Sequence, residues 1–99
     1  MNKQYFQTGK ATVAAGGTAQ AVTVGFQPSY VKCFSVNNLV TYEWFVGMSA
    51  DTSLNIANHA DTQISVNAAG GITVSASGFT MGTDIADTTA DVVYWVAAR

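Results

Sequence analysis

The residue types that most often carry out chemistry in proteins are scarce in this chain, which has one histidine, His59, and one cysteine, Cys33. Asp61 follows two positions after His59, but a zinc site needs three or four ligands of the His, Cys, Asp or Glu type. Because His59 and Cys33 lie far apart with no second pair beside them, the pattern favours a solvated loop histidine and a small, buried cysteine. A single cysteine also excludes a disulfide within the chain.

Three aspartates near the C-terminus, Asp84, Asp87 and Asp91, could suggest a calcium site. Calcium loops place their ligands at alternate positions and have a glycine at the sharp turn. Here the spacing is three residues and then four, and only Gly82 precedes the aspartates. The pattern therefore favours a solvated loop with Asx-turns, and a calcium ion shared between subunits is the alternative.

Other catalytic motifs are poorly matched. Glu43 lies beside Trp44 without an obvious acidic partner of the kind that glycoside hydrolysis needs. The Gly-Gly pairs lack the Lys-Ser or Lys-Thr of a phosphate loop, and there is no G-x-S-x-G motif, although a Ser-His-Asp triad assembled in space stays open. The sequence predicts no catalytic residue, no cofactor and no metal site, so we expect a protein that is not an enzyme.

Aromatic residues gather in two stretches of the chain, at 42–45 and 94–95. Such rings usually form the core of a small β-domain, but an apolar run such as 92–96 cannot place all of its side chains in one core. One side of this run must face either the other half of the domain or a neighbouring subunit. We predict contacts with other subunits or with a larger assembly at Tyr5, Phe6, Tyr42, Trp44, Tyr94 and Trp95.

Charged residues make up only 10% of the chain, against about 25% in ordinary soluble domains. The net charge is −2 and the four basic residues are scattered, so the sequence lacks the basic stripe of a nucleic-acid-binding protein. It has neither a signal-peptide pattern nor an apolar run that would span a membrane as a helix. A surface with few charges does little to keep neighbouring molecules apart, which favours a protein that other subunits partly cover.

Twelve valines, twelve threonines and only two leucines favour strands over helices. Apolar and polar residues alternate between turns such as Gly-Gly and Asn-Asn, and the turns recur every 8 to 12 residues or so. This spacing predicts an all-β protein, a single β-sandwich or jelly-roll-like domain of about eight short antiparallel strands. The expected strands span residues 10–15, 18–26, 30–36, 39–46, 62–67, 72–76, 79–81 and 92–98.

The remaining segments are assigned from their composition. Residues 1–9 are expected to form a short extended N-terminal arm, and residues 10–99 the β-sandwich domain. Residues 47–61 are the least regular part of the chain, and one helical turn could form at 50–56. The last strand, at 92–98, is apolar on both sides, so we expect it to be central in the sheet and covered on both faces.

Three stretches of the sequence resemble small structural proteins of tailed bacteriophages. They are VTVGFQPSYVKCFSVNN at 22–38, YEWFVGM at 42–48 and GITVSASGFTMGTDIADTTADVVYWVAAR at 71–99. The shared features are a GF-x-P-x-x-V strand entry, a W-F-x-G-M strand exit, a G-I-x-V-x-x-x-G-F-x-x-G hairpin and a closing Y-W-V-A-x-R strand. Together the three stretches cover more than half of the chain.

The resemblance implies a β-sandwich or jelly-roll module, commonly trimeric and without catalytic residues. Related domains occur as capsid decoration (cement) proteins and as terminal domains of tail fibres. Because the chain starts at Met1 and has nothing that could form a fibre stalk, we expect a free-standing decoration protein that stabilises the phage head by binding between capsomers. It would lie on the capsid surface of the virion after assembly in the host bacterial cytoplasm.

The expected partners are further copies of the chain, with a homotrimer favoured, and the phage major capsid protein, without nucleic acid or membrane. The alternative is a receptor-binding domain of a tail fibre or spike that recognises a host glycan or protein. In that case Tyr42, Trp44 or the loops at 47–61 and 82–91 would make the contacts. A carbohydrate-binding module outside any virus is a third hypothesis.

Overall fold

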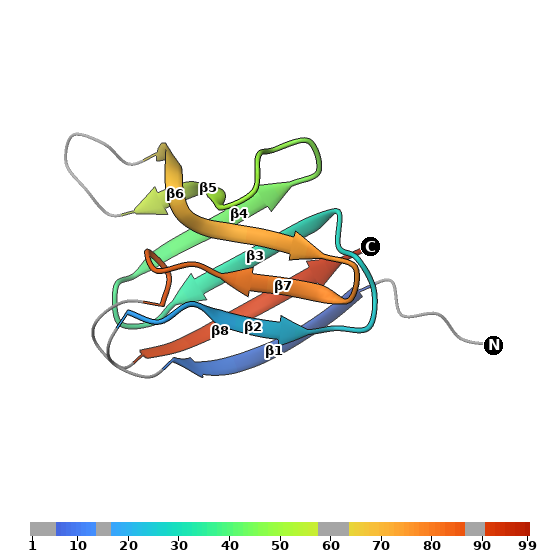
Figure 1. Ribbon diagram of the computed structural model, residues 1–99. Coiled ribbons are helices and arrows are strands. Elements are labelled where there is room, and N and C mark those ends of the chain that lie inside the picture. The colour runs from blue at the N-terminus through green and yellow to red at the C-terminus, as the bar shows by residue number, and fades with distance from the viewer. Residues whose placement is uncertain (1–5, 14–16, 58–63, 87–90) are drawn as a thin grey trace.

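Strands form where apolar and polar side chains alternate along the chain. The computed structural model describes residues 6–13, 17–57, 64–86 and 91–99, and their regular structure is entirely β (Figure 1). No helix long and apolar enough to cross a membrane occurs in this part of the chain. The strands are β1 (Phe6–Val13), β2 (Gln20–Thr23), β3 (Tyr30–Ser35), β4 (Val40–Phe45), β5 (Thr52–Ala57), β6 (Ile64–Ser75), β7 (Gly78–Met81) and β8 (Asp91–Ala98).

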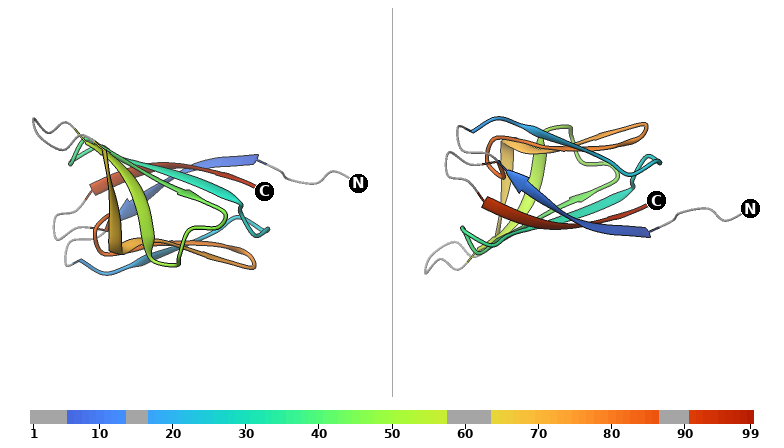
Figure 2. Two further views of the ribbon diagram at one scale, coloured as in Figure 1. Left: turned by 90° about the horizontal axis from the view of Figure 1, so that it is seen from above. Right: turned by 90° about the horizontal axis from the view of Figure 1, so that it is seen from below.

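All eight strands belong to one antiparallel sheet, in the order β1-β8-β3-β4-β5-β6-β7-β2. Figure 2 shows that this sheet is folded over on itself and nearly closed, with β1, β8 and β3 in one layer and β2 and β7 in the other. Strand β5 and the first half of β6 cross from one layer to the other (Figure 2). The prediction of a single all-β domain of about eight antiparallel strands is therefore confirmed.

Strand β6 contains the bend at which the sheet changes layer. Its first half pairs with β5 and its second half with β7. The pairing with β5 shifts register between Thr52 and Ser53, where residues 68–71 form an irregular bulge. A Cβ atom on Gly71 would lie only 2.4 Å from the carbonyl carbon of Thr52, so this close approach of two backbones requires glycine.

The inward side chains of the two layers form one core. Trp95 of β8 meets Phe79 of β7 edge to face, with the ring centroids 5.5 Å apart, so this pair joins the layers. Gly9 of β1 makes room for the indole, since a Cβ atom there would lie 2.4 Å from Cζ2 of Trp95. The buried apolar residues are Ala11, Val13, Val24, Phe26, Val31, Cys33, Tyr42, Trp44, Ile72, Phe79, Met81, Ile85, Ala86, Val93, Trp95 and Ala97.

Strand β8 lies inside the sheet, between β1 and β3, as the sequence predicts. The chain covers only one of its two faces, however. Val93 and Trp95 point inward and are buried, whereas Tyr94 points outward and is 50% exposed. The expectation that both faces are covered is wrong for the single chain, because the alternation of a strand sends every second apolar side chain outward.

Three expected segments differ from the structure. Strand β1 begins at Phe6, which pairs with Ala98 of β8, so residues 6–9 belong to the sheet and not to an arm. The helical turn expected at 50–56 is wrong, because strand β5 forms there and its backbone pairs with β4 and β6. The separate strands expected at 62–67 and 72–76 are largely the two halves of β6, since the intervening residues bulge without ending the strand.

Candidate contact surfaces

The one cysteine of the chain lies in the core. Cys33 points inward from β3 and is fully buried. Burial disfavours the charged thiolate and raises the pKa of the Cys33 thiol to about 12. The thiol therefore stays protonated at neutral pH and is a poor nucleophile, because only the thiolate is a good one. Cys33 packs as a small apolar side chain, as the sequence predicts.

Asp91 is a buried carboxylate at the start of β8, and its hydrogen bonds hold the turn after β3. The Ser35 hydroxyl donates to one carboxylate oxygen, and the backbone N–H groups of Asn37 and Val92 donate to the other at 2.9 Å and 2.7 Å. A buried carboxylate needs such donors in place of water. The role of Asp91 is thus to fix the connection between β3 and β4 against β8.

Asp84 has a different partner, because its carboxylate accepts a hydrogen bond from the side-chain amide of Asn67. The two aspartates are therefore engaged separately. In the described part of the chain, no three His, Cys, Asp or Glu side chains lie together as a metal site would require. Three residues considered in the sequence fall outside the described ranges, namely His59, Asp61 and Asp87.

Glu43, the acidic residue considered for glycoside hydrolysis, has a hydrogen-bond partner on β3. The Tyr30 hydroxyl donates to Oε2 of Glu43 at 2.5 Å, and the Tyr30 ring packs against Phe45 with the centroids 5.2 Å apart. Burial and, to a smaller degree, this carboxylate raise the pKa of Tyr30 to about 12. Glu43 therefore ties β4 to β3 on the outward side of the sheet.

The six residues predicted to make contacts fall into two groups. Phe6 is 61% exposed and Tyr94 50% exposed, so both can touch another molecule, while Tyr5 lies outside the described residues. The other three, Tyr42, Trp44 and Trp95, are at most 8% exposed, because they occupy the inward positions of β4 and β8. The prediction that these three residues make contacts is corrected, since they belong to the core.

A mostly apolar surface covers the outward side of β1, β8 and β3. Tyr94 of β8 pairs with Lys10 on one side and with Phe34 on the other. Paired residues on one face of a sheet have Cβ atoms about 5 Å apart, so their side chains form a continuous surface. We call it the β8 face, and it consists of Thr8, Lys10, Lys32, Phe34, Val36, Val92, Tyr94 and Val96.

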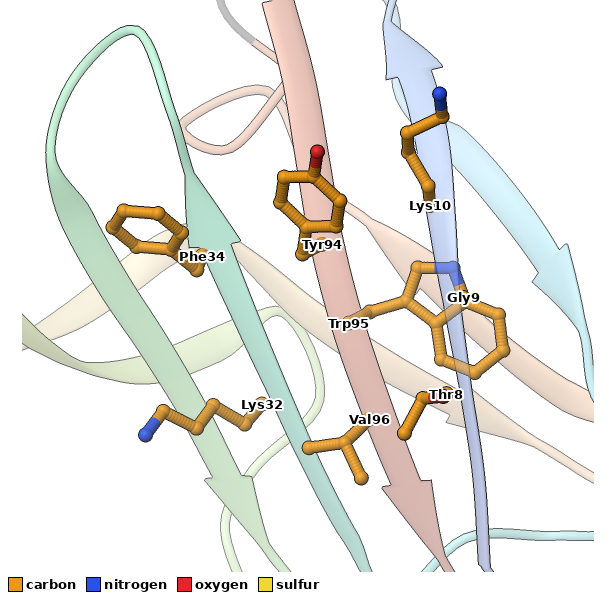
Figure 3. A pocket seen from close by; sticks show the side chains of 8 residues that line it. All are labelled: Thr8, Gly9, Lys10, Lys32, Phe34, Tyr94, Trp95 and Val96. Atoms are coloured by element: carbon orange, nitrogen blue, oxygen red, sulfur yellow. The ribbon is translucent and has the colours of Figure 1, made fainter.

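The middle of the β8 face is hollowed. The hollow has a volume of about 540 Å³ and is lined by residues of β1, β3 and β8. In Figure 3, Tyr94 stands between Phe34 and Lys10, and the Trp95 indole extends toward Gly9. Exposed aromatic rings beside two exposed lysines, Lys10 and Lys32, can bind an apolar partner that carries negative charge.

A strained leucine extends this face. Leu39, in the turn between β3 and β4, has a φ of 55°, in the left-handed region that leucine rarely adopts. Its side chain is 62% exposed and lines a second hollow of about 460 Å³ with Val36 and Val92. Leu39 is therefore strained without becoming buried, and such strain is typical of functional positions.

A second apolar surface lies on the outward side of β5 and the first half of β6. Ile64 and Val66 of β6 are 66% and 67% exposed, and their pairing partners on β5 are also apolar. Strand β7 pairs only with the second half of β6, so no strand among the described residues covers the outer edge of the first half. We call this surface the hairpin patch, and it consists of Leu54, Ile56, Ile64 and Val66.

Most of these exposed residues were not predicted as contacts, although the sequence contained a signal for some. The alternation at 30–36 places Phe34 and Val36 on the side opposite Cys33, so a buried Cys33 implies that both point outward. For the hairpin patch the signal was incomplete, because Ile64 and Val66 lie in the expected strand 62–67 but Leu54 and Ile56 lie in the irregular segment 47–61.

The chain matches no protein-family model, no curated protein and no solved structure. The resemblance to phage structural proteins therefore stays a prediction from the residues that carry it. The fold and its surfaces describe an all-β domain with two exposed apolar faces, and any function must be argued from those faces.

Proposed function

We propose that the protein is a non-enzymatic structural protein of a tailed-phage virion that decorates the capsid by binding between capsomers of the major capsid protein. The exposed apolar β8 face is the observation that carries this proposal. Monomeric proteins rarely expose large apolar patches, and those patches usually mark binding surfaces. The resemblance of residues 22–48 and 71–99 to phage structural proteins supports the virion setting.

The mechanism of such a protein is thermodynamic. A protein that binds the assembled shell, and not its separate subunits, stabilises the shell by mass action. Several linked copies bind with avidity, so each single contact can be weak. We therefore propose a homo-oligomer, with a trimer favoured, that lies on the capsid surface after assembly in the bacterial cytoplasm.

The test is binding of the purified protein to expanded capsids that lack their decoration protein. We expect saturable binding in a fixed ratio to the capsomers, and capsids that release their DNA at a higher temperature. Binding that never saturates, or an unchanged release temperature, would contradict the proposal.

Phe6 is the residue on which to test the capsid contact, because it is exposed and lies at the end of β1. We expect Phe6→Ala, or deletion of residues 1–5, to lower capsid occupancy while the free energy of unfolding changes by only about 0.5 kcal/mol or less. Residues 6–9 must be retained, since they pair with β8. Val46→Ala, at another exposed apolar position, is the matched control and should leave occupancy unchanged.

The second candidate function is recognition of a host receptor by a fibre or spike. The hollow around Tyr94 and Phe34 favours it, because exposed aromatic rings provide a platform for sugars. A glycan array probed with the purified protein distinguishes the two functions. Binding to a defined glycan that Tyr94→Ala abolishes would support recognition, and a blank array together with capsid binding would support decoration.

A further inference from the structure

The hollow of the β8 face is lined by positive charge and not by negative charge. Lys10 and Lys32, two of the four basic residues of the chain, line it. No acidic residue of the described ranges does so, although the net charge of the whole chain is −2. Within those ranges, neither lysine makes an ion pair. The hollow is therefore a positively charged site on an acidic protein.

Glu43 is the acidic residue closest to the hollow in the sheet. It pairs with Lys32 across β3 and β4, so it lies on the side of Lys32 that faces away from β8. Its Oε2 atom already accepts the hydrogen bond from the Tyr30 hydroxyl. Lys10 lies two strands farther from Glu43, on β1. The hollow thus keeps positive charge on both sides of β8.

The two lysines stand at opposite corners of the hollow (Figure 3). Lys10 pairs with Tyr94, and Lys32 pairs with Val96 on the other side of β8. Strands lie about 4.8 Å apart and residues about 3.4 Å apart along a strand, which places the two Cα atoms about 12 Å from each other. The ammonium groups extend away from each other (Figure 3). Two negative groups on either side of an apolar one therefore match this arrangement better than a single anion.

The floor between the lysines is apolar. Exposed rings of Tyr94 and Phe34 form it together with Val96, and the volume of about 540 Å³ is within the range of ligand-binding sites, about 300–1,000 Å³. Besides the lysines, the outward side chains of the lining with hydrogen-bonding atoms are Thr8 and Tyr94. Because buried sugar hydroxyls each need a hydrogen-bond partner, this floor suits an apolar side chain better than a sugar ring.

We propose that the hollow binds a protein segment in which acidic residues flank a large apolar side chain. The apolar side chain packs on Tyr94 and Phe34, and the acidic groups lie against Lys10 and Lys32. A fatty acid carries one negative group and would match only one lysine. The inference deepens the proposed function, because it gives the chemistry of the segment that a capsid protein would present, and it rests on that function for the identity of the partner.

The test uses four synthetic peptides of equal length, titrated into the ¹⁵N-labelled full chain and followed by NMR. The first peptide has aspartate at its first, third and fifth positions, with phenylalanine and leucine between them. Asparagine replaces aspartate in the second peptide, lysine replaces aspartate in the third, and serine replaces both apolar residues in the fourth. We expect saturable binding of the aspartate peptide, with amide shifts centred on Tyr94.

The other three peptides separate charge from apolar contact. The asparagine and serine peptides should each bind about tenfold more weakly than the aspartate peptide, since each lacks one of the two contributions. The lysine peptide should not bind. Added salt should weaken binding of the aspartate peptide and leave that of the asparagine peptide unchanged, because salt screens exposed charges.

Variants of the chain locate the charge contribution. Lys10→Gln with Lys32→Gln should raise the dissociation constant of the aspartate peptide to that of the asparagine peptide, and should leave the asparagine peptide unaffected. Arg99→Gln is the matched control, because it removes a positive charge beyond the end of β8 and outside the lining of the hollow. It should change the dissociation constant by about twofold or less. Far-UV circular dichroism checks that the variants fold.

Several results would overturn the inference. Equal affinity for the aspartate and asparagine peptides would remove the role of charge, and unaltered affinity in the double lysine variant would remove the role of Lys10 and Lys32. Shifts centred on another surface, or no saturable binding, would exclude the hollow as a peptide site. Tighter binding of a hyaluronan oligosaccharide at Tyr94 than of the aspartate peptide would assign the hollow to an acidic sugar instead.

Capsid occupancy distinguishes failure of this inference from failure of the proposed function. If the aspartate peptide binds in the hollow but the protein binds no capsid, the inference holds and the decoration function is contradicted. If the protein saturates capsids and the double lysine variant does so with the same affinity, the decoration function stands and the inference is overturned.

Discussion

Tyr94 and Trp95 are adjacent residues of β8 with opposite surroundings. The Trp95 ring packs against Phe79 in the core, while Tyr94 stands half-exposed in the hollow of the β8 face. An exposed aromatic side chain at the centre of a surface is the usual form of a binding hot spot. Neighbouring positions of one strand therefore divide between the core and the exposed surface.

This division predicts different effects for two alanine substitutions. We expect Trp95→Ala to lower the free energy of unfolding by about 3–5 kcal/mol, since it removes a buried aromatic side chain. Tyr94→Ala should lower it by about 1 kcal/mol or less at a protein concentration low enough to keep the chain monomeric. Urea unfolding measures both values, and equal losses would contradict the assignment of the two faces.

Cys33 and Tyr30 also affect the free energy of unfolding at alkaline pH. Burial raises the pKa of Cys33 from 9.0 to about 12, and burial with the Glu43 hydrogen bond raises that of Tyr30 from 10.0 to about 12. Both groups are neutral when protonated, so the unfolded chain loses these protons at lower pH than the folded chain does. The free energy of unfolding should therefore be highest below pH 9 and fall as the pH rises toward 12.

Urea unfolding at a series of pH values between 8 and 11 or so tests this slope. Cys33→Ala should make the decline shallower, because one of the two groups that cause it is removed. The same slope in wild type and variant would show that the buried thiol does not contribute.

Among the elements, β3 and β8 were the easiest to predict. Strand β3 alternates between inward and outward residues, β8 is a continuous apolar run, and turn or loop residues bound both, so their limits agree with the structure to within about one residue. Strand β5 was missed because its alternation is short, since only Leu54 and Ile56 alternate with polar residues, and because its inward side is polar, with Ser53 buried. Local pattern cannot reveal a strand that is stabilised mainly by its neighbours.

The bend of β6 was also beyond local pattern. The sequence Ala68-Ala69-Gly70-Gly71 predicts a turn between two strands, and the structure uses it as a bulge within one strand. The difference lies in Gly71, whose contact with the Thr52 backbone is made across strands. The contact residues could not be predicted from local pattern either, because the packing of all eight strands determines which apolar residues stay uncovered.

Gly71 is the residue at which to test the bend of β6. We expect Gly71→Ala to lower the free energy of unfolding by at least about 1–3 kcal/mol, because its Cβ atom would lie 2.4 Å from a backbone carbon that cannot move freely. Ala69→Ser, at an exposed position of the same bulge, is the control and should change it by about 0.5 kcal/mol or less. A neutral Gly71→Ala would mean that the two strands are not held this closely.

At the scale of the whole molecule, composition and structure agree on one feature. Only ten of the 99 residues are charged, and the outward side of the sheet exposes the β8 face, whose charged members are Lys10 and Lys32, and the hairpin patch, which has no charged member. Contact with other molecules would cover those surfaces. The low charge of the chain thus has a physical reason if the protein functions as one of many packed copies.

The central claim is that this protein functions by contact within a larger particle. It is tested most directly by counting and locating the chain in particles purified from cells that make it, using quantitative mass spectrometry with cryo-electron microscopy. We predict many copies on the capsid surface, arranged by the symmetry of the shell. Particles that contain no copy of the chain would contradict the account.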